Sequence, residues 1–346
     1  MTQPPDHVHV ALRQLAQGQP LSRTQMRDFM SRILTGEMEP AQMAAFLTFY
    51  ALRLPTVDEL VGAIGIMREH ATMIAHPHDK AIDTCGTGGV HSNLMNISTA
   101  SAIVAAAAGA KVCKHGNRAV TSRSGSSDAL AALGVNINTT PEQEARCLND
   151  IGLCFAFAPR HHPGMKHVAP IRQALGFPSI FNMVGPLVNP GAVKRQLLGV
   201  RSPEVARLLA EVLRQSGSVR AWVISGQDPQ IGRLCEVSIT GPTHVSMLDQ
   251  GHVTEFEMKP AAPYVATDLQ SLTVESPSQS AALIYQVLSG ASGVPRAMII
   301  ANAAAALWVA EVAKDYAEGL TLATQALDSG QARKVLEQLI KLSHQV

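Results

Sequence analysis

The sequence of 346 residues has few aromatic residues, 4% of the total, and almost no excess of charge of either sign. Its 28 basic and 27 acidic side chains give a formal charge of +1, so no overall field attracts nucleic acid or an anionic membrane. Few aromatic side chains are present on which unpaired bases could stack. We therefore do not expect nucleic acid to be a partner, and any attraction for an anion has to be local.

Cysteine and long apolar runs are also scarce. The five cysteines are odd in number and show no C-x-x-C spacing, which disfavours a disulfide framework or a structural zinc site. The longest apolar run, SAIVAAAAGAKVC at 101–113, is too short to span a bilayer. The polar start MTQPPDHVHV has no apolar segment typical of a signal peptide. These features lead us to expect a cytoplasmic protein without a membrane segment.

Apolar residues make up 46% of the chain. Within residues 1–77 they recur at spacings of three and four, which predicts helices over 9–18, 22–36, 39–54 and 56–74. The expected helix starts are Ser22, Glu39 with Pro40, and Thr56, and the expected ends are Gly18 and Gly36. We expect a helical domain over 1–77, joined by part of 170–192, whose simplest role is packing and dimerisation.

From residue 78 onward, short apolar runs alternate with helical stretches. The runs that indicate strands or strand ends are 81–85, 110–116, 153–159, 196–200, 221–226, 236–241 and 296–304. The helical stretches are Ser98–Ala110, Ser126–Leu133, Pro141–Asp150, Pro203–Ser216, Ser278–Leu288 and Asn302–Lys314. This alternation is typical of an α/β fold with a largely parallel central sheet flanked by helices, which we expect over 78–346. Ligands bind beyond the carboxyl ends of such strands.

The stretch CGTGGVHSNLMNIST, residues 85–99, follows the first expected strand and contains Gly86, Gly88 and Gly89. Glycine allows backbone N–H groups to approach a ligand closely. A helix then opens with residues that favour helix starts, namely Asn96, Ser98 and Thr99. The free N–H groups of a first helical turn form an anion site. By itself such a loop is equally consistent with a simple tight turn.

A second polar loop, KHGNRAVTSRSGSSD at 114–128, follows the next strand. Its side chains are cations, other hydrogen-bonding groups and hydroxyls: Lys114, Arg118, Arg123, His115, Asn117, Ser122, Ser124, Ser126 and Ser127. Charge from ammonium and guanidinium groups, with hydroxyls and N–H groups for the oxygens, suits a phosphorylated ligand. The simpler alternative is a serine-rich surface turn.

Three further residues are candidates because of their chemistry. Arg172 is able to clamp a carboxylate through two hydrogen bonds, and His162 is able to hydrogen-bond or exchange a proton. Taken alone, each is more often a structural residue. Glu236 is the single acid in the apolar run EVSITG, where a carboxylate is costly unless it is paired or bound to a cation such as Mg²⁺. Solvation at a strand edge is the alternative for Glu236.

Taken together, these segments resemble the anthranilate phosphoribosyltransferases and their relatives, which include the pyrimidine nucleoside phosphorylases. The resemblance covers nearly the whole chain: GTGG and NISTASA, KHGNRAVTSRSGSSDAL, HHPGMKHVAPIR, IFNMVGPLVNP and EVSITGPT. KHGNR and GPLVNP favour the anthranilate branch. The family transfers the 5-phosphoribosyl group of 5-phosphoribosyl diphosphate (PRPP) to the amine of anthranilate in tryptophan biosynthesis, and it works with Mg²⁺ as a homodimer formed through the helical domain.

The resemblance also implies roles for individual residues. The PRPP-binding residues would be Gly86, Gly88, Gly89, Asn96, Ser98, Thr99, Lys114 and Ser126. The anthranilate-binding residues would be Asn117, His162 and Arg172, and the magnesium ligands would be Ser98 and Glu236. Because departure of pyrophosphate leaves an oxocarbenium-like ribose, positioning and charge neutralisation carry most of the catalysis. Lys114 would neutralise the departing charge, and Arg172 would orient the acceptor.

The chain departs from the family pattern near the metal and diphosphate. Val90 stands where the family has an aspartate, followed by His91 and Leu94 in place of a glycine and a threonine. Cys235 replaces a second aspartate, next to Glu236, and Pro178 replaces an arginine. Removing two carboxylates weakens a magnesium site. Two alternatives therefore stand beside the anthranilate reaction: a divergent paralogue that uses another acceptor or plain phosphate, as the phosphorylases do, and a non-catalytic binding protein.

Overall fold

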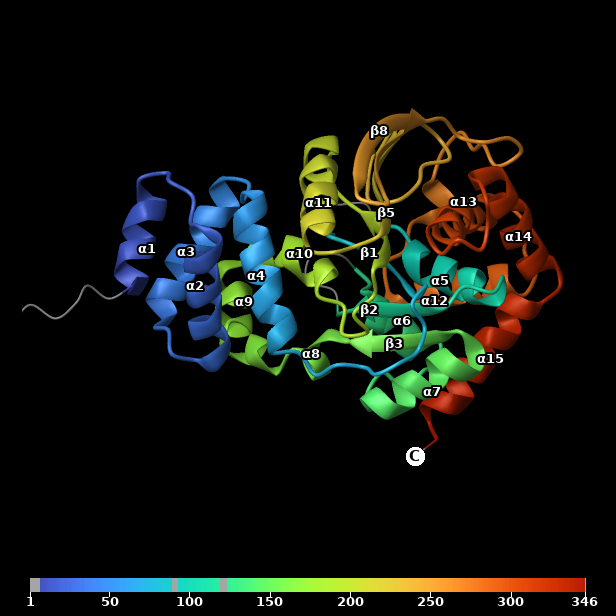
Figure 1. The fold of residues 1–346 in the computed structure, drawn as a ribbon. Coiled ribbons are helices and arrows are strands. Elements are labelled where there is room, and N and C mark those ends of the chain that lie inside the picture. The colour runs from blue at the N-terminus through green and yellow to red at the C-terminus, as the bar shows by residue number, and fades with distance from the viewer. Residues whose placement is uncertain (1–6, 89–92, 119–122, 346) are drawn as a thin grey trace, which may run out of the picture. The chain divides into compact units, whose positions relative to one another are not determined.

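The computed structural model describes residues 7–88, 93–118 and 123–345 (Figure 1). The chain folds into two compact units. Unit 1 comprises Met1–Thr72 and Pro159–Val188, and unit 2 comprises Met73–Ala158 and Asn189–Val346. No helix among the described residues is long and apolar enough to cross a membrane.

Unit 1 is helical. It contains α1 (His7–Ala16), α2 (Arg23–Thr35), α3 (Pro40–Leu52) and α4 (Val57–Glu69). Its second segment begins within α8 (Ala158–His161) and contains η1 (Pro163–His167), α9 (Ala169–Leu175), α10 (Ile180–Val184) and η2 (Gly185–Leu187). The predicted starts are confirmed: Ser22 caps α2, Glu39 precedes Pro40 at the start of α3, and Thr56 caps α4. Gly36 ends α2 in the left-handed conformation that glycine adopts without strain.

A buried carboxylate connects the helices of unit 1. Glu59, fully buried on α4, accepts hydrogen bonds from the Leu21 amide at 2.9 Å and the Tyr50 hydroxyl at 2.6 Å. It also accepts from the Thr56 amide at 2.7 Å and from the Arg53 guanidinium at 2.9 and 2.6 Å. The carboxylate thereby joins the end of α3, the start of α4 and the segment before α2.

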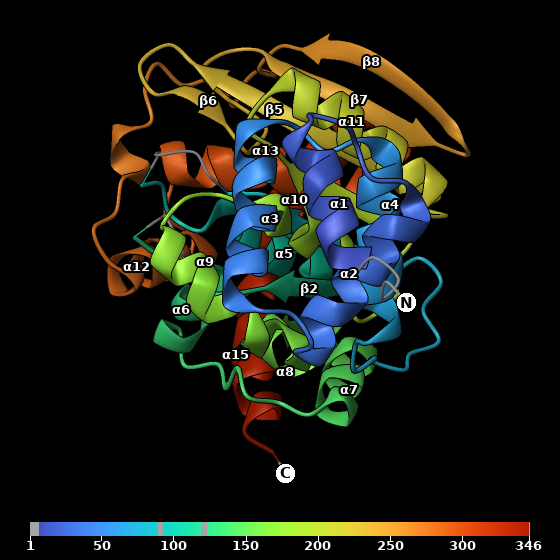
Figure 2. The same cartoon turned by 90° about the vertical axis from the view of Figure 1, so that its left-hand side faces the viewer.

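Unit 2 contains an eight-stranded mixed sheet in the order β3-β2-β1-β4-β5-β7-β8, with β6 paired to β5. The strands are β1 (Ile82–Gly86), β2 (Val112–Gly116), β3 (Leu153–Phe157), β4 (Arg195–Gly199), β5 (Arg220–Asp228), β6 (Gly232–Leu234), β7 (Thr243–Asp249) and β8 (His252–Met258). β1 to β5 pair in parallel, and β6 to β8 are antiparallel. Figure 2 shows β5 to β8 at one end of the unit. The expected α/β fold with a largely parallel sheet and a helical N-terminal domain is confirmed.

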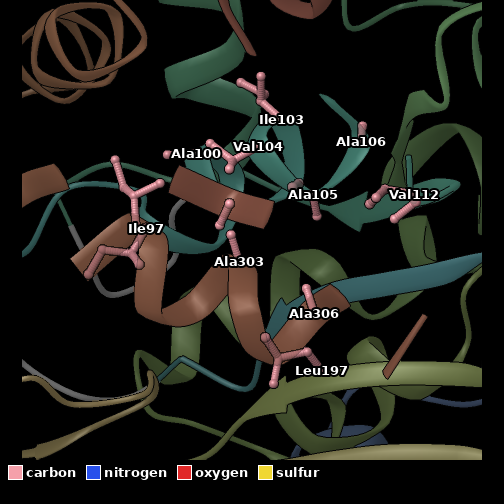
Figure 3. Packing of buried hydrophobic residues seen from close by; sticks show 14 of the residues in the cluster. Ile97, Ala100, Ile103, Val104, Ala105, Ala106, Val112, Leu197, Ala303 and Ala306 are labelled. Atoms are coloured by element: carbon pink, nitrogen blue, oxygen red, sulfur yellow. The ribbon is translucent and has the colours of Figure 1, made fainter. Parts of the chain in front are cut away.

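Helices of unit 2 lie on both faces of the sheet, with α11 opposite α5 and α13 (Figure 1). They are α5 (Ile97–Ala107), α6 (Ser126–Ala132), α7 (Pro141–Ile151), α11 (Pro203–Gln215), η3 (Gln270–Leu272), α12 (Pro277–Leu288), α13 (Val294–Val309), α14 (Tyr316–Asp328) and α15 (Gln331–Ser343). Most alanines of α5 and α13 are buried and let these two helices pack closely, with Ala303 toward α5 and Ala306 near Leu197 of β4 (Figure 3). This packing places the start of α5 beyond the ends of β1 and β2.

Two strand predictions are wrong. Residues 296–304 lie in α13, because a short apolar run does not by itself distinguish a buried strand from a buried helix. Residues 236–241 form an irregular segment after β6. There the backbone of Val237 bonds to the Asn302 side chain, and the Ser238 amide bonds to the Thr243 hydroxyl. Side chains therefore take the backbone groups that a sheet ladder would use.

Candidate functional site

The candidate site of unit 2 lies where the strand order reverses. β1 is flanked by β2 on one side and β4 on the other, and Gly86 pairs with Gly199 at the carboxyl ends of β1 and β4. The Thr87 amide then donates to the Gly199 carbonyl at 2.9 Å. In open parallel sheets, ligands bind at such reversal points. Gly86 and Gly88 are exposed there, and Gly88 has a φ of +63°. Gly89, Val90, His91 and Ser122 lie outside the described residues.

Asn96 connects the loops that follow β1 and β2. Its Oδ1 accepts from the hydroxyls of Ser124 and Ser280, each at 2.7 Å, and its Nδ2 donates to the Ser124 carbonyl at 3.1 Å. The Asn96 amide N–H donates to the Ser280 hydroxyl at 2.9 Å. Asn96 therefore holds the start of α5 in place through bonds within the protein.

The Lys114 ammonium lies beneath the first turn of α5. Lys114, on β2, is only 2% exposed, and its Nζ donates to the Thr84 carbonyl and to the Ser98 hydroxyl, the latter at 3.3 Å. Burial lowers the pKa of Lys114, and the nearby carboxylates of Asp83 and Glu236 partly offset that effect. Thr99, next to Ser98, is buried, and its hydroxyl has no hydrogen-bond partner among the described residues.

Glu236 brings a carboxyl group to this cation. Burial raises the pKa of Glu236 to about 8, and the Lys114 ammonium partly opposes the rise. The neighbouring Cys235 Sγ lies 3.9 Å from the Gly88 carbonyl oxygen. Burial, followed by the charge of Glu236, raises the pKa of Cys235 to about 12, so its thiol is protonated at neutral pH. Asp83 on β1 is fully buried, and burial raises its pKa to about 6.

The loop after β2 carries the remaining predicted residues of unit 2. Ser126 begins α6, and its hydroxyl donates to the carbonyl of the exposed Asn117 at 3.5 Å. A side chain at Gly116 would collide with the Ser126 hydroxyl, so glycine makes room for this approach. Arg118 and Arg123 are exposed; Arg118 pairs with Asp128 at 3.6 Å and Arg123 with Glu275 at 3.3 Å.

Unit 1 holds the other two predicted residues. Arg172 on α9 is partly buried, with its guanidinium carbon 5.5 Å from the centre of the Phe181 ring and a nitrogen 3.5 Å from Asn182 Oδ1. No carboxylate pairs with Arg172 within residues 7–88, 93–118 and 123–345. Burial, followed by the charge of His161, lowers the pKa of His162 to about 4, so this ring is neutral at physiological pH.

The structure thus brings together Gly86, Gly88, Ser98, Lys114 and Glu236 in unit 2, and it places His162 and Arg172 in unit 1. Sequence reasoning did not single out three residues at the site of unit 2: Asp83, Ser280 and Asn302. Asp83 and Asn302 are lone polar residues in apolar runs, the same signal that identified Glu236. Ser280 gives no comparable signal.

The donor atoms at the site determine which metal ion it suits. The described part of the chain has no cluster of three or more histidine, cysteine or acidic residues able to hold a metal. Glu236 supplies one hard oxygen donor beside the Ser98 hydroxyl, and the Cys235 thiol stays protonated. This set fits Mg²⁺, which is commonly bound by one or two carboxylates with water and substrate phosphates completing its shell.

Comparisons with known proteins match nearly the whole chain. Residues 10–71 match the helical bundle domain of a glycosyl transferase family, and residues 78–333 match the a/b domain of that family. The anthranilate phosphoribosyltransferase of Chromobacterium violaceum is 44% identical over 97% of this chain and 98% of its own length. The enzyme of that name from Methylorubrum extorquens is 45% identical, with the same coverage.

Solved structures show the same fold. The anthranilate phosphoribosyltransferase of Thermus thermophilus superimposes with a TM-score of 0.88 at 33% identity, covering 97% of this chain and 99% of that one. The Saccharomyces cerevisiae enzyme in complex with PRPP and Mg gives a TM-score of 0.86 at 27% identity, with 98% of both chains covered.

Proposed function

Because this chain belongs to the glycosyl transferase family whose helical bundle and a/b domains it matches, we propose that it transfers the 5-phosphoribosyl group of PRPP to the amine of anthranilate and releases pyrophosphate. This reaction belongs to tryptophan biosynthesis. The observation that carries the proposal is the group of Ser98, Lys114 and Glu236 at the start of α5. The relatives named above are anthranilate phosphoribosyltransferases, which favours this function over phosphorolysis or binding alone.

The described residues suit the diphosphate end of PRPP. The first turn of α5 offers the Ser98 hydroxyl and the positive end of the helix dipole, and the exposed Gly86 and Gly88 allow close approach of an anion. Lys114 contributes positive charge from beneath this turn, and it holds the Ser98 hydroxyl. Charge that is already in place where pyrophosphate departs lowers the barrier without further reorganisation. Thr99, Asn96 and Ser126 are the remaining described residues proposed to bind PRPP. Asn96 would act by holding the two loops in place.

Magnesium when bound would neutralise part of the diphosphate charge, and Glu236 and Ser98 are the residues that would hold it. In the protein without the ion, the high pKa of Glu236 keeps this carboxyl largely protonated at neutral pH. A bound cation would therefore shift Glu236 from its protonated form to its ionised form. Lys114 stabilises the carboxylate once it forms.

Arg172 would orient the acceptor through its carboxylate. Since no described carboxylate pairs with it, this guanidinium remains available to an acidic ligand, and its position against Phe181 limits its freedom. The neutral ring of His162 and the amide of Asn117 would supply hydrogen bonds. No strong general base is needed, because the aromatic amine is already a usable nucleophile.

The proposal includes a homodimer formed through unit 1, in the cytoplasm. α3 supports it, because this helix is apolar around most of its circumference and ends with Leu52, whose side chain is 81% exposed. Contiguous exposed apolar residues mark interaction surfaces, and Ala51 beside Leu52 is exposed as well. Sedimentation of the wild type and of Leu52→Glu tests the dimer, and the variant is expected to sediment as a monomer.

The reaction is tested directly by mixing the protein with PRPP, Mg²⁺ and anthranilate and following the loss of anthranilate fluorescence. Turnover is expected, and it should fall at least tenfold in Ser98→Ala, which removes a hydroxyl expected to contact substrate or metal. Arg233→Ala, an exposed change on β6, serves as the control and should keep wild-type turnover. Absence of turnover at every magnesium concentration would contradict the proposed function.

A further inference from the structure

We propose that Asn302 is a positioning residue that fixes Glu236 at the diphosphate end of the site, an inference that rests on the proposed function. Asn302 lies on α13, is fully buried and is separated from Glu236 by 66 positions in the sequence. Its carboxamide holds both backbone groups of Val237: the Val237 amide donates to Oδ1 at 2.8 Å, and Nδ2 donates to the Val237 carbonyl at 3.1 Å. The residue next to Glu236 therefore has its peptide groups fixed by one side chain.

The helix that carries Asn302 is a rigid support. Asn302 Nδ2 also donates to the Met298 carbonyl one turn earlier at 2.9 Å, which fixes the orientation of the carboxamide. Neighbouring residues of α13 are fully buried, and Ala303 and Ala306 pack into the core with α5 (Figure 3). α5 carries Ser98 at its first turn. Asn302 therefore ties Glu236 to the same core that positions the Ser98 hydroxyl.

Contacts on the other side of the segment leave it little room to move. A Cβ at Gly199 would collide with the Cys235 carbonyl oxygen, and one at Gly226 would collide with the Glu236 carbonyl oxygen. The Glu236 segment therefore lies directly on the ends of β4 and β5. The Ser238 amide donates to the buried Thr243 hydroxyl at 2.9 Å, which provides a second anchor from β7.

This arrangement explains why an irregular segment can carry a ligand. Outside a sheet ladder, the backbone around Glu236 has no repeating hydrogen bonds to hold it, and buried peptide groups without partners are costly. The Asn302 carboxamide supplies the missing donor and acceptor together. A metal-binding carboxylate loses affinity when its support is loosened, typically by 10–100-fold.

The test measures PRPP binding by calorimetry with and without Mg²⁺. Asn302→Ala is expected to weaken Mg²⁺-dependent PRPP binding about tenfold and to leave the smaller Mg²⁺-free binding unchanged. Ser101→Ala is the matched control. It removes a buried hydrogen bond from α5 to the Ile299 carbonyl of α13, the helix that carries Asn302, but it leaves the bonds to Val237 in place. Its binding should equal that of the wild type.

The decisive comparison repeats Asn302→Ala in a Glu236→Gln background. If Asn302 acts through Glu236, adding Asn302→Ala to the Glu236→Gln protein should alter PRPP binding less than twofold. An equal loss in both backgrounds, or no loss in either, overturns the positioning role while the proposed function stands. A wild-type protein that shows no Mg²⁺-dependent PRPP binding overturns both. If Asn302→Ala does not fold, Thr243→Val loosens the same segment and is expected to show the same coupling with Glu236→Gln.

Discussion

Replacing Glu59 with alanine is expected to lower the free energy of unfolding by about 3–5 kcal/mol, the usual cost of breaking a buried ion pair. The magnitude follows from what the carboxylate holds. Its removal leaves the buried Tyr50 hydroxyl and the Leu21 amide without their acceptor, at about 1–3 kcal/mol each. The free-energy cost at Arg53 is smaller, because its side chain is 26% exposed and reaches water.

The pH dependence of this effect has a definite sign. Burial raises the pKa of Glu59, but the bonds from Arg53, Thr56, Tyr50 and Leu21 outweigh it, so the pKa lies below the ordinary value of 4.5. A carboxyl whose pKa is depressed by folding stabilises the native state above its unfolded pKa. The difference between wild type and Glu59→Ala should therefore be full at pH 7 and should shrink as the pH falls below about 4.5.

Urea unfolding of the full chain, followed by helical circular dichroism, measures the change. Asp58→Ala is the matched control, since Asp58 occupies the same first turn of α4 and pairs with Arg23 at 2.7 Å, with both side chains largely exposed. Its cost should stay below about 1 kcal/mol. Hydrogen exchange at the Leu21 amide gives a local readout and should accelerate only in Glu59→Ala. Equal costs for the two variants, with unchanged exchange, would refute the reasoning.

Three further predictions concern the site. Arg172→Lys should raise the KM for anthranilate about 10–100-fold, as expected for a lost charged hydrogen bond, with the KM for PRPP unchanged; equal changes in both constants would count against a carboxylate clamp. Since the pKa of Glu236 is raised to about 8, Mg²⁺-dependent PRPP affinity should rise roughly tenfold between pH 7 and pH 9. Calorimetry at the two pH values should show this rise in the wild type and no rise in Glu236→Gln. Introducing aspartate at both Val90 and Cys235 should raise Mg²⁺-dependent PRPP affinity; calorimetry without a gain would mean that the altered loop binds the diphosphate in another way.

Local chemistry made the helical elements predictable. Ser22 and Thr56 cap their helices with hydrogen bonds to amides three residues ahead, so the signal and the structure lie within one turn. Glu236 was identified as a candidate because a lone acid in an apolar run needs a partner or a ligand, and Lys114 because it opens a loop of cations and hydroxyls. Their roles toward a ligand stay predictions. Their proximity follows from the fold, since neighbouring parallel strands end at the same edge of the sheet.

The features that could not be predicted depend on contacts between residues far apart in the sequence. The run EVSITG alternates like a strand, but Val237 bonds to an asparagine 65 residues away, and no local pattern encodes that pairing. The run RAMIIANAA is equally ambiguous, and its helix follows from packing of its alanines against α5. Ser280 reaches Asn96 across 184 positions. The roles proposed for His162 and Arg172 depend on a ligand, so they stay predictions.

The charge balance at the start of α5 determines how this chain can hold a diphosphate. At position 235 an aspartate would add a second negative charge beside Glu236, where the Lys114 ammonium acts on Glu236 and the Arg201 guanidinium acts on position 235. The Cys235 thiol is protonated, and Glu236 itself holds a proton at neutral pH in the absence of a cation. Asp83, with a pKa of about 6, is then the ionised acid near Lys114, and Cys235 and Glu236 add no negative charge at the helix start, which favours an anion there. Compared with the aspartate that the family resemblance implies at this position, we expect Cys235 to lower the attraction for Mg²⁺ and, by the same charge, to raise the attraction for the free diphosphate. Binding of pyrophosphate without magnesium should therefore weaken in Cys235→Asp, although Mg²⁺-dependent binding strengthens in the same protein.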